Sequence, residues 1–174
     1  MERFFAYKAA MNTQYGTLDM RLLSKVLPET LFNKIMFDSS VDMISAVPIF
    51  QFPGNERLLQ TIAICLRPEI YLPHDYLIYK DDVAEEMYFI IEGSVDIITT
   101  DNKRILKSLS TGDFVGEMAL LNNNKRACSV ICNSFCFIYI LKKKDFMKIM
   151  ERHESIFNTL RQTSVQRNAE LPKE

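Results

Sequence analysis

A glycine, a glutamate and an arginine lie close together in the sequence as Gly116, Glu117 and Arg126. Gly116 permits a sharp bend, and the good helix formers over 117–121 follow it. A short helix that begins after a glycine presents free backbone N–H groups to a phosphate, and Arg126 can face the same anion with its planar guanidinium. A carboxylate repels phosphate, so Glu117 is expected to accept a hydrogen bond from a neutral hydroxyl such as a ribose 2′-OH. The segment therefore predicts a site that binds a sugar and its phosphate together.

The composition favours a folded domain with an appendage. The chain has 174 residues, of which 48% are hydrophobic and 25% charged, so it can bury a core. Its net charge of −1 gives no electrostatic support for a nucleic-acid partner. The longest apolar runs, over 87–91 and 135–141, are too short to span a bilayer, and no signal peptide is visible. We expect the chain to be part of a longer protein.

The cysteines suggest a structural role in a reducing compartment. There are four, they form no CxxC pair, and three are evenly spaced, as Cys128, Cys132 and Cys136. That spacing permits a metal-site interpretation, but the two histidines, His74 and His153, lie far away in sequence. Buried, reduced thiols in strands are the favoured interpretation, with a cytosolic setting and no metal or cofactor.

The pattern of apolar residues divides the chain into a helical segment, 1–47, and a mostly β domain, 48–174. Short helices are expected over 18–27, 29–37 and 41–47, and longer ones over 56–66, 142–153 and 154–168. Asn55 is a candidate cap for the helix over 56–66, and Leu160 and Val165 are among the residues expected to face inward from the last helix. Between them, strands are expected over 69–72, 76–79, 87–91, 94–99, 104–108, 128–132 and 135–141. Many short strands with turn signals predict an α+β fold: an antiparallel β-roll, jelly-roll-like, with the short helix 117–121 inserted and helices on both sides.

With these elements in order, residues 46–171 resemble a cyclic nucleotide-binding domain. The resemblance rests on Tyr71 to Ile78, where glycine is usual at the place of His74, on Glu86 to Val95, and on Gly116 to Ala127. The last of these stretches is similar to the phosphate-binding cassette of the family.

The resemblance implies a role for each site residue, with cAMP or cGMP as the ligand. Glu117 would accept from the ribose 2′-OH and Arg126 would bind the cyclic phosphate. Ala127 stands where cGMP-responsive members often carry a threonine, so cAMP is favoured. The remaining implied ligand-binding residues are Gly116, Met118 and Ala119 through their backbone, Cys128 in place of a common alanine, Leu109 at the base, and Arg167 and Leu171 on a lid helix.

The N-terminal segment resembles the end of the C-linker in cyclic nucleotide-gated and hyperpolarisation-activated channels. This implies a cytoplasmic domain of a plasma- or ciliary-membrane protein, in which lid closure is coupled to gating, with a homotetramer as a possible assembly. A sodium/proton exchanger or a kinase regulatory subunit is the alternative parent. An enzyme is disfavoured because no nucleophile–base pair or metal cluster has suitable spacing, and a nucleic-acid partner because no DNA-reading module follows.

Overall fold

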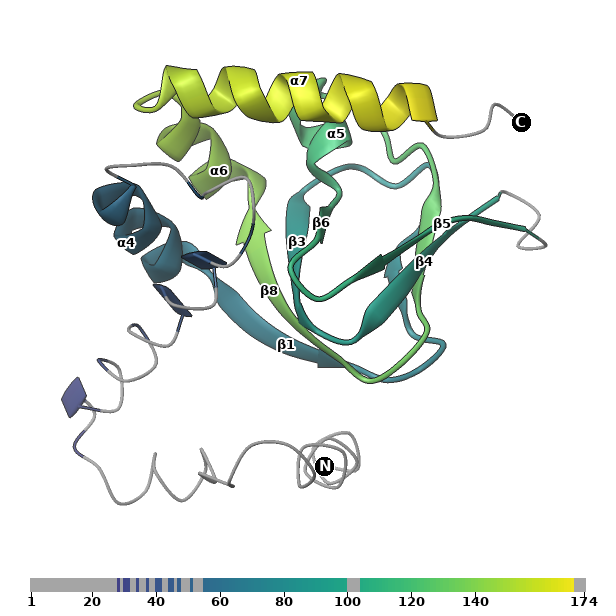
Figure 1. The fold of residues 1–174 in the computed structure, drawn as a ribbon, viewed down its shortest axis with the longest axis horizontal. Helices are drawn as coiled ribbons and strands as arrows, with labels where there is room; N and C mark the ends of the chain where they lie inside the picture. The colour runs from purple at the N-terminus through teal and green to yellow at the C-terminus, as the bar shows by residue number, and fades with distance from the viewer. Residues whose placement is uncertain are drawn as a thin grey trace.

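A computed structural model describes residues 55–99 and 104–170, together with isolated positions between 28 and 51 (Figure 1). Its named elements are α4 (Glu56–Cys65), β1 (Arg67–Tyr71), β2 (Tyr76–Ile78), β3 (Glu86–Glu92), β4 (Ser94–Ile98), β5 (Ile105–Ser110), β6 (Phe114–Val115), α5 (Glu117–Leu121), β7 (Ser129–Cys132), β8 (Cys136–Lys142), α6 (Lys143–Met150) and α7 (Glu154–Glu170). From residue 56 onward, where the chain is described apart from 100–103 and 171–174, each predicted strand and helix has a counterpart whose boundaries differ by about one turn or less.

The strands form two four-stranded antiparallel sheets, in the orders β1-β8-β3-β6 and β2-β7-β4-β5. Sequence neighbours β3 and β4 belong to different sheets, so the chain passes from one sheet to the other and closes a roll. Helix α5 lies between β6 of one sheet and β7 of the other. The predicted fold class, an antiparallel roll with an inserted short helix and flanking helices, is confirmed.

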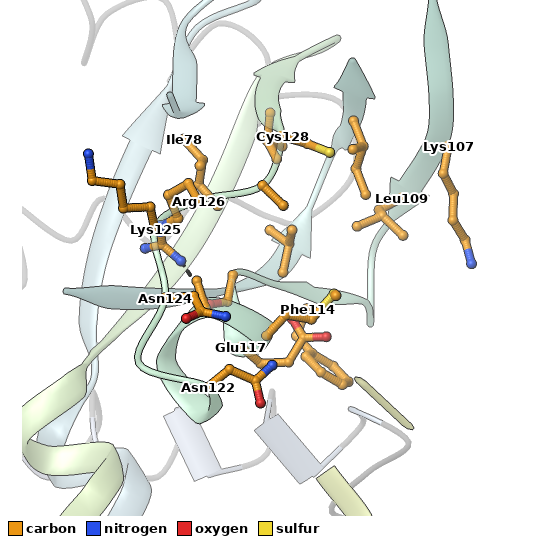
Figure 2. A pocket seen from close by; sticks show the side chains of 17 residues that line it. Ile78, Lys107, Leu109, Phe114, Glu117, Asn122, Asn124, Lys125, Arg126 and Cys128 are labelled. Atoms are coloured by element: carbon orange, nitrogen blue, oxygen red, sulfur yellow. Dashed lines mark hydrogen bonds between the residues drawn. The ribbon is translucent and has the colours of Figure 1, made fainter. Parts of the chain in front are cut away.

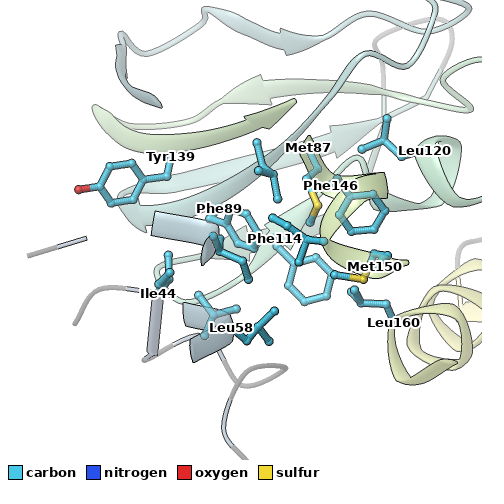
Figure 3. Packing of buried hydrophobic residues seen from close by; sticks show 14 of the residues in the cluster. Ile44, Leu58, Met87, Phe89, Phe114, Leu120, Tyr139, Phe146, Met150 and Leu160 are labelled. Atoms are coloured by element: carbon cyan, nitrogen blue, oxygen red, sulfur yellow. The ribbon is translucent and has the colours of Figure 1, made fainter. Parts of the chain in front are cut away.

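Helices cover one side of the roll and share a core with it. Figure 1 shows α7 running along the top over α5, with α4 and α6 beside the end of β8. Figure 3 shows Phe89 and Phe114 from the strands meeting Phe146, Met150 and Leu160 from α6 and α7. Burying an apolar side chain of this size stabilises the fold by about 1.5–3 kcal/mol, so this contact region anchors both C-terminal helices. A second apolar cluster, which includes Val95, Ile138 and Val130, fills the interior of the roll.

Described positions between 37 and 47 of the N-terminal segment pack on the same core. The described residues at 30, 31, 34, 37, 40, 41, 44 and 45 are helical, in line with the expected short helices. Ile44 and Val47 are fully buried, and the Ser40 hydroxyl donates to Tyr139 Oη on β8 at 2.9 Å. The helix expected over 18–27 lies outside the described residues.

Two local expectations were wrong. Asn55 occupies the N-cap position of α4, but its side chain makes no capping hydrogen bond. Val165, expected to face inward from α7, is 66% exposed, while Leu160 and Ser164 are buried among the side chains of that helix that the structure describes. Leu160 is buried as expected, and in the next turn the packing of α7 against α5 and α6 buries Ser164 in place of Val165.

The position of His74 explains why glycine is usual there. His74 has a φ of 72°, and its backbone N–H donates to Cys132 O at 2.7 Å, which holds the turn between β1 and β2. A left-handed backbone conformation costs a residue that has a Cβ roughly 1–2 kcal/mol of stability. Glycine avoids this cost, but part of the advantage is lost because glycine is more flexible in the unfolded chain. The exposed imidazole makes no contribution to the core.

We predict that His74→Gly raises the free energy of unfolding by roughly 0.5–1 kcal/mol, because the relief of strain exceeds the entropic cost. Urea denaturation of both proteins measures this difference. His74→Ala, which removes the imidazole but keeps a Cβ at positive φ, is the control and should give no gain. Equal stabilisation by glycine and alanine would contradict a backbone origin.

Candidate functional site

Helix α5 begins after Gly116, where any residue with a Cβ would displace neighbouring atoms. Gly116 occupies the N-cap position with a φ of 92°. A Cβ added to Gly116 would lie 2.7 Å from Arg126 Nη1 and 3.3 Å from both Glu86 O and Ile78 Cδ1. The bend at Gly116 therefore brings the start of α5, the strand β3 and Arg126 into direct contact.

Arg126 is buried at 5% exposure and is held by both its backbone and its side chain. It lies in the segment between α5 and β7. Its N–H donates to Asp82 O at 3.0 Å, and its carbonyl accepts from the Asp81 N–H at 2.9 Å. In the side chain, Nη1 donates to Gly116 O at 2.7 Å and Nη2 donates to Glu86 O. The guanidinium is thus fixed in place before any ligand binds.

The guanidinium lies in a partly apolar environment. Its central carbon is 5.9 Å from the centroid of the Tyr88 ring. Burial lowers the pKa of Arg126, while neighbouring Tyr88, Glu86 and Asp82 oppose that shift, and arginine stays protonated in proteins. Burial, followed by the nearby Glu86, raises the pKa of Tyr88 to about 12, so the phenol is neutral at physiological pH. Because a guanidinium has more N–H donors than these two carbonyls occupy, Arg126 can still donate to an anion.

A cavity of about 190 Å³ adjoins this arginine (Figure 2). One row of cross-strand partners contributes to its wall: Ile78 on β2 pairs with Val130 on β7, Val130 with Ile97 on β4, and Ile97 with Lys107 on β5. Such partners point to the same face of a sheet. Residues 114–119, from β6 and α5, contribute another part of the lining.

Glu117 is 2% exposed although its side chain is polar, and it lines the cavity. In the view of Figure 2 its side chain lies below those of Arg126 and Leu109, next to Phe114. The cavity combines a buried carboxyl group, a fixed guanidinium and a wall of apolar side chains. It can therefore bind a ligand that has an anionic group, a hydroxyl group and a flat, largely apolar ring.

The structure brings most of the sequence-predicted site residues together. The residues that line the one cavity are Leu109, Gly116, Glu117, Met118, Ala119, Arg126, Ala127 and Cys128. Arg167 lies in α7, whose backbone is described there without its side chain, and Leu171 lies outside the described residues. The lid roles of these last two remain predictions.

Sequence reasoning missed several lining residues, namely Ile78, Ile97, Lys107, Phe114, Val115, Asn122, Asn124, Lys125 and Val130. One signal was available: strand alternation places Lys107 on the same face as Leu109. The other strand residues belong to the site only through pairing between strands that are distant in sequence.

The described residues, 55–99 and 104–170 with the isolated positions before them, contain no group of His, Cys, Asp or Glu suited to a metal. The cysteines are free thiols; Cys132 and Cys136 are buried, and Cys128 lines the cavity. None of the described helices is long and apolar enough to cross a membrane.

Comparison with protein families finds a match over residues 68–153 to the family described as "Cyclic nucleotide-binding domain". Among curated proteins, the chain is 31% identical over 165 residues to the cyclic nucleotide-gated channel beta-1 of Bos taurus, which covers 91% of this chain and 12% of that channel. It is 29% identical over 143 residues to the Homo sapiens cyclic nucleotide-gated channel alpha-3, covering 79% of this chain and 20% of that channel. The chain thus spans a small part of these relatives.

Solved structures share the fold. The regulatory domain of Toxoplasma gondii PKA with cAMP matches with a TM-score of 0.71 at 21% identity, over 83% of this chain and 54% of that one. The regulatory subunit of a cAMP-independent protein kinase A from Trypanosoma brucei matches with a TM-score of 0.69 at 26% identity, over 78% of this chain and 48% of that one. One of these structures is described with cAMP, and the other belongs to a protein kinase A described as cAMP-independent.

Proposed function

Residues 68–153 belong to the cyclic nucleotide-binding domain family, and we propose that the cavity beside Arg126 binds a cyclic nucleotide as a regulatory ligand. The observation that carries the proposal is that Arg126 and Glu117, both buried, line one cavity with an apolar row of strand residues. The cyclic phosphate binds at Arg126, the ribose 2′-OH donates to Glu117, and the purine lies over the apolar row. The domain binds its ligand without converting it.

We propose that cAMP is preferred to cGMP. Ala127 lines the cavity and has no hydroxyl, so it cannot bond the 2-amino group of guanine. Gly116, Met118 and Ala119 contribute backbone groups around the phosphate and ribose, and Cys128 and Leu109 contribute apolar contacts.

We further propose that ligand binding moves the helices, and that a longer protein responds to this movement. Phe114 lines the cavity and also packs in the core with Leu120 of α5 and Leu160 of α7, so a ligand that shifts Phe114 or α5 acts on α7. Arg167 and Leu171 close over the base as a lid. Ile44, buried in the same cluster, carries the change towards the N-terminal segment.

The identity to cyclic nucleotide-gated channels supports a channel as the parent protein, with this domain on the cytoplasmic side of a plasma or ciliary membrane. The segment 1–47 then acts as a partial C-linker before the binding domain 48–174, and a homotetramer is the assembly that we propose. The likeness to kinase regulatory subunits keeps that parent as a second candidate. A sodium/proton exchanger is the third.

The ribose contact provides the test of this function. Calorimetry of the wild-type protein should detect cAMP binding, and 2′-deoxy-cAMP should bind roughly 10–150-fold more weakly, because a hydrogen bond to a charged group contributes about 1.5–3 kcal/mol. In Glu117→Gln the neutral amide oxygen still accepts, so the same change of ligand should cost only about 2–12-fold.

The difference between these two ratios isolates the pair formed by Glu117 and the 2′-OH from any general effect of the substitution. Non-cyclic 5′-AMP serves as the control for the cyclic phosphate. Equal losses for 2′-deoxy-cAMP in both proteins would remove Glu117 from the ribose site, and no heat with any cyclic nucleotide would refute the proposed function.

A further inference from the structure

A second cavity, of about 230 Å³, shares Arg126 and Ile78 with the first cavity and is otherwise lined by different residues. These come from β2, from the start of β3 and from the segment that joins the two strands. Beside Arg126, the polar part of the lining consists of three tyrosines and three acids, namely Tyr76, Tyr79, Tyr88, Asp82, Glu85 and Glu86.

The wall of the second cavity already binds one cation, the guanidinium of Arg126. Its central carbon lies 5.9 Å from the centroid of the Tyr88 ring, and Nη2 donates to Glu86 O. The Tyr88 hydroxyl donates to Glu86 Oε2 at 3.3 Å, which holds a carboxylate next to the aromatic ring. An aromatic face attracts a cation, and a carboxylate accepts strong hydrogen bonds from one. The same types of side chain continue along the cavity beyond Arg126.

The acids of the lining outnumber its arginine. Three carboxylates and one guanidinium give the lining a formal charge of −2, and the side chains of Asp82 and Glu85 are exposed. In the part of the chain that the structure describes, no three such side chains are grouped so that they could hold one metal ion. The carboxylates are spread along the cavity, and this suits a longer cation with more than one charged group.

Tyr76 and Tyr79 supply an apolar surface between these charges. Their rings are stacked, with centroids 4.5 Å apart and an interplanar angle of 11°. Tyr79 is 55% exposed, and Val83, which also lines the cavity, is 66% exposed. A ligand that enters from solvent can therefore lay methylene groups against this surface while its ammonium groups reach the carboxylates.

We propose that the second cavity binds a linear polyamine, an organic cation whose ammonium groups are separated by short methylene chains. Two ammonium groups neutralise the formal charge of the lining and donate to the carboxylates of Asp82 and Glu85. The methylene groups between them lie against Tyr79 and Val83. This site is separate from the one proposed for the nucleotide, although Arg126 adjoins both.

Calorimetry of the wild-type protein with spermidine tests the site. Two further probes are n-butylammonium, which has a single charge, and Mg²⁺, which has two charges but no methylene chain. Spermidine should bind at least about tenfold more tightly than either. Equal binding of spermidine and Mg²⁺ would reduce the effect to charge attraction and overturn the proposal. Tighter binding of the capped peptide Lys-Gly-Lys than of spermidine would overturn it in favour of a polypeptide partner.

The combined change Asp82→Asn and Glu85→Gln should weaken spermidine binding roughly tenfold, because two partly exposed ionic hydrogen bonds are lost. The matched control is Glu151→Gln with Glu154→Gln, which removes the same charge from two exposed side chains that do not line the cavity. The control should change the affinity by less than about twofold. Equal losses in the two proteins would overturn the assignment to this cavity.

The aromatic contribution is tested at Tyr79. Tyr79→Leu should weaken spermidine binding by roughly two- to fivefold, whereas Tyr79→Phe keeps the ring and should retain the wild-type affinity. Glu117→Gln should leave spermidine binding unchanged, and a loss there would place the polyamine in the first cavity and contradict the proposal. Since cyclic nucleotides are absent from these titrations, failure of the polyamine site leaves the proposed function to its own test.

Discussion

Replacing Arg126 by alanine is expected to weaken cAMP binding by roughly ten- to a hundredfold or more, since it removes a charge-assisted contact to the phosphate. Arg126 is the most strongly held cation of the cavity: two backbone carbonyls accept from its guanidinium, and its backbone pairs with residues 81–82. Because the guanidinium is already held in place, ligand binding costs little further conformational entropy at this side chain. A titration of fluorescent cAMP against both proteins measures the change.

Two controls separate binding from folding. Removal of the guanidinium also withdraws a donor from Gly116 O and Glu86 O, which is expected to cost about 1–3 kcal/mol of stability, so the variant must first be shown to be folded by urea denaturation. Arg126→Lys keeps the charge without the planar fork and should fall between wild type and alanine in affinity. A folded Arg126→Ala protein with wild-type affinity would exclude Arg126 from the phosphate site.

Gly116→Ala is expected to have the second large effect, on stability and affinity together. The new Cβ would lie 2.7 Å from Arg126 Nη1 and 3.3 Å from Glu86 O, at a φ of 92°. The guanidinium must move out of its two hydrogen bonds to accommodate it. We expect a loss of about 2–4 kcal/mol in stability, from left-handed backbone plus a disrupted buried contact, and at least tenfold weaker cAMP binding.

The chain offers a matched control at Gly112. Its φ is 91°, almost the same as that of Gly116, but a Cβ there would meet nothing within 4 Å. Gly112→Ala should thus show the backbone cost of about 1–2 kcal/mol with nearly unchanged affinity. If both alanine variants lost affinity to the same extent, strain in the backbone would explain the result and the contact with Arg126 would not.

Much of the architecture could be predicted from local patterns. Short apolar runs separated by turn residues identified the strands, and the helix after Gly116 begins and ends as expected, at Glu117 and Leu121. The left-handed backbone of His74 agrees with the glycine that is usual at its place. These features depend on backbone sterics and on side chains that are close in sequence. They can therefore be predicted from short segments of the chain without knowledge of its tertiary structure.

Other predictions failed where packing competes with local preference. The hydrophobic pattern of α7 placed Val165 inside, yet Ser164 is buried and Val165 is exposed, because contacts with α5 and α6 determine which face of the helix is covered. Asn55 occupies the N-cap position of α4, but its side chain makes no capping hydrogen bond. The preference of asparagine for N-cap positions is an average over many proteins, and the environment of one residue can override it.

The sequence by itself placed a glycine-led turn, an acid and an arginine within a β-roll and predicted that they lie close together, as they do around one cavity. Only the tertiary structure decided what surrounds them: the carbonyls of Gly116 and Glu86 that hold Arg126, and the cross-strand row that ends at Lys107. Helix turns form between neighbours in the chain, whereas these contacts join strands that are distant in sequence. Their register depends on the packing of the whole roll, which no local pattern encodes.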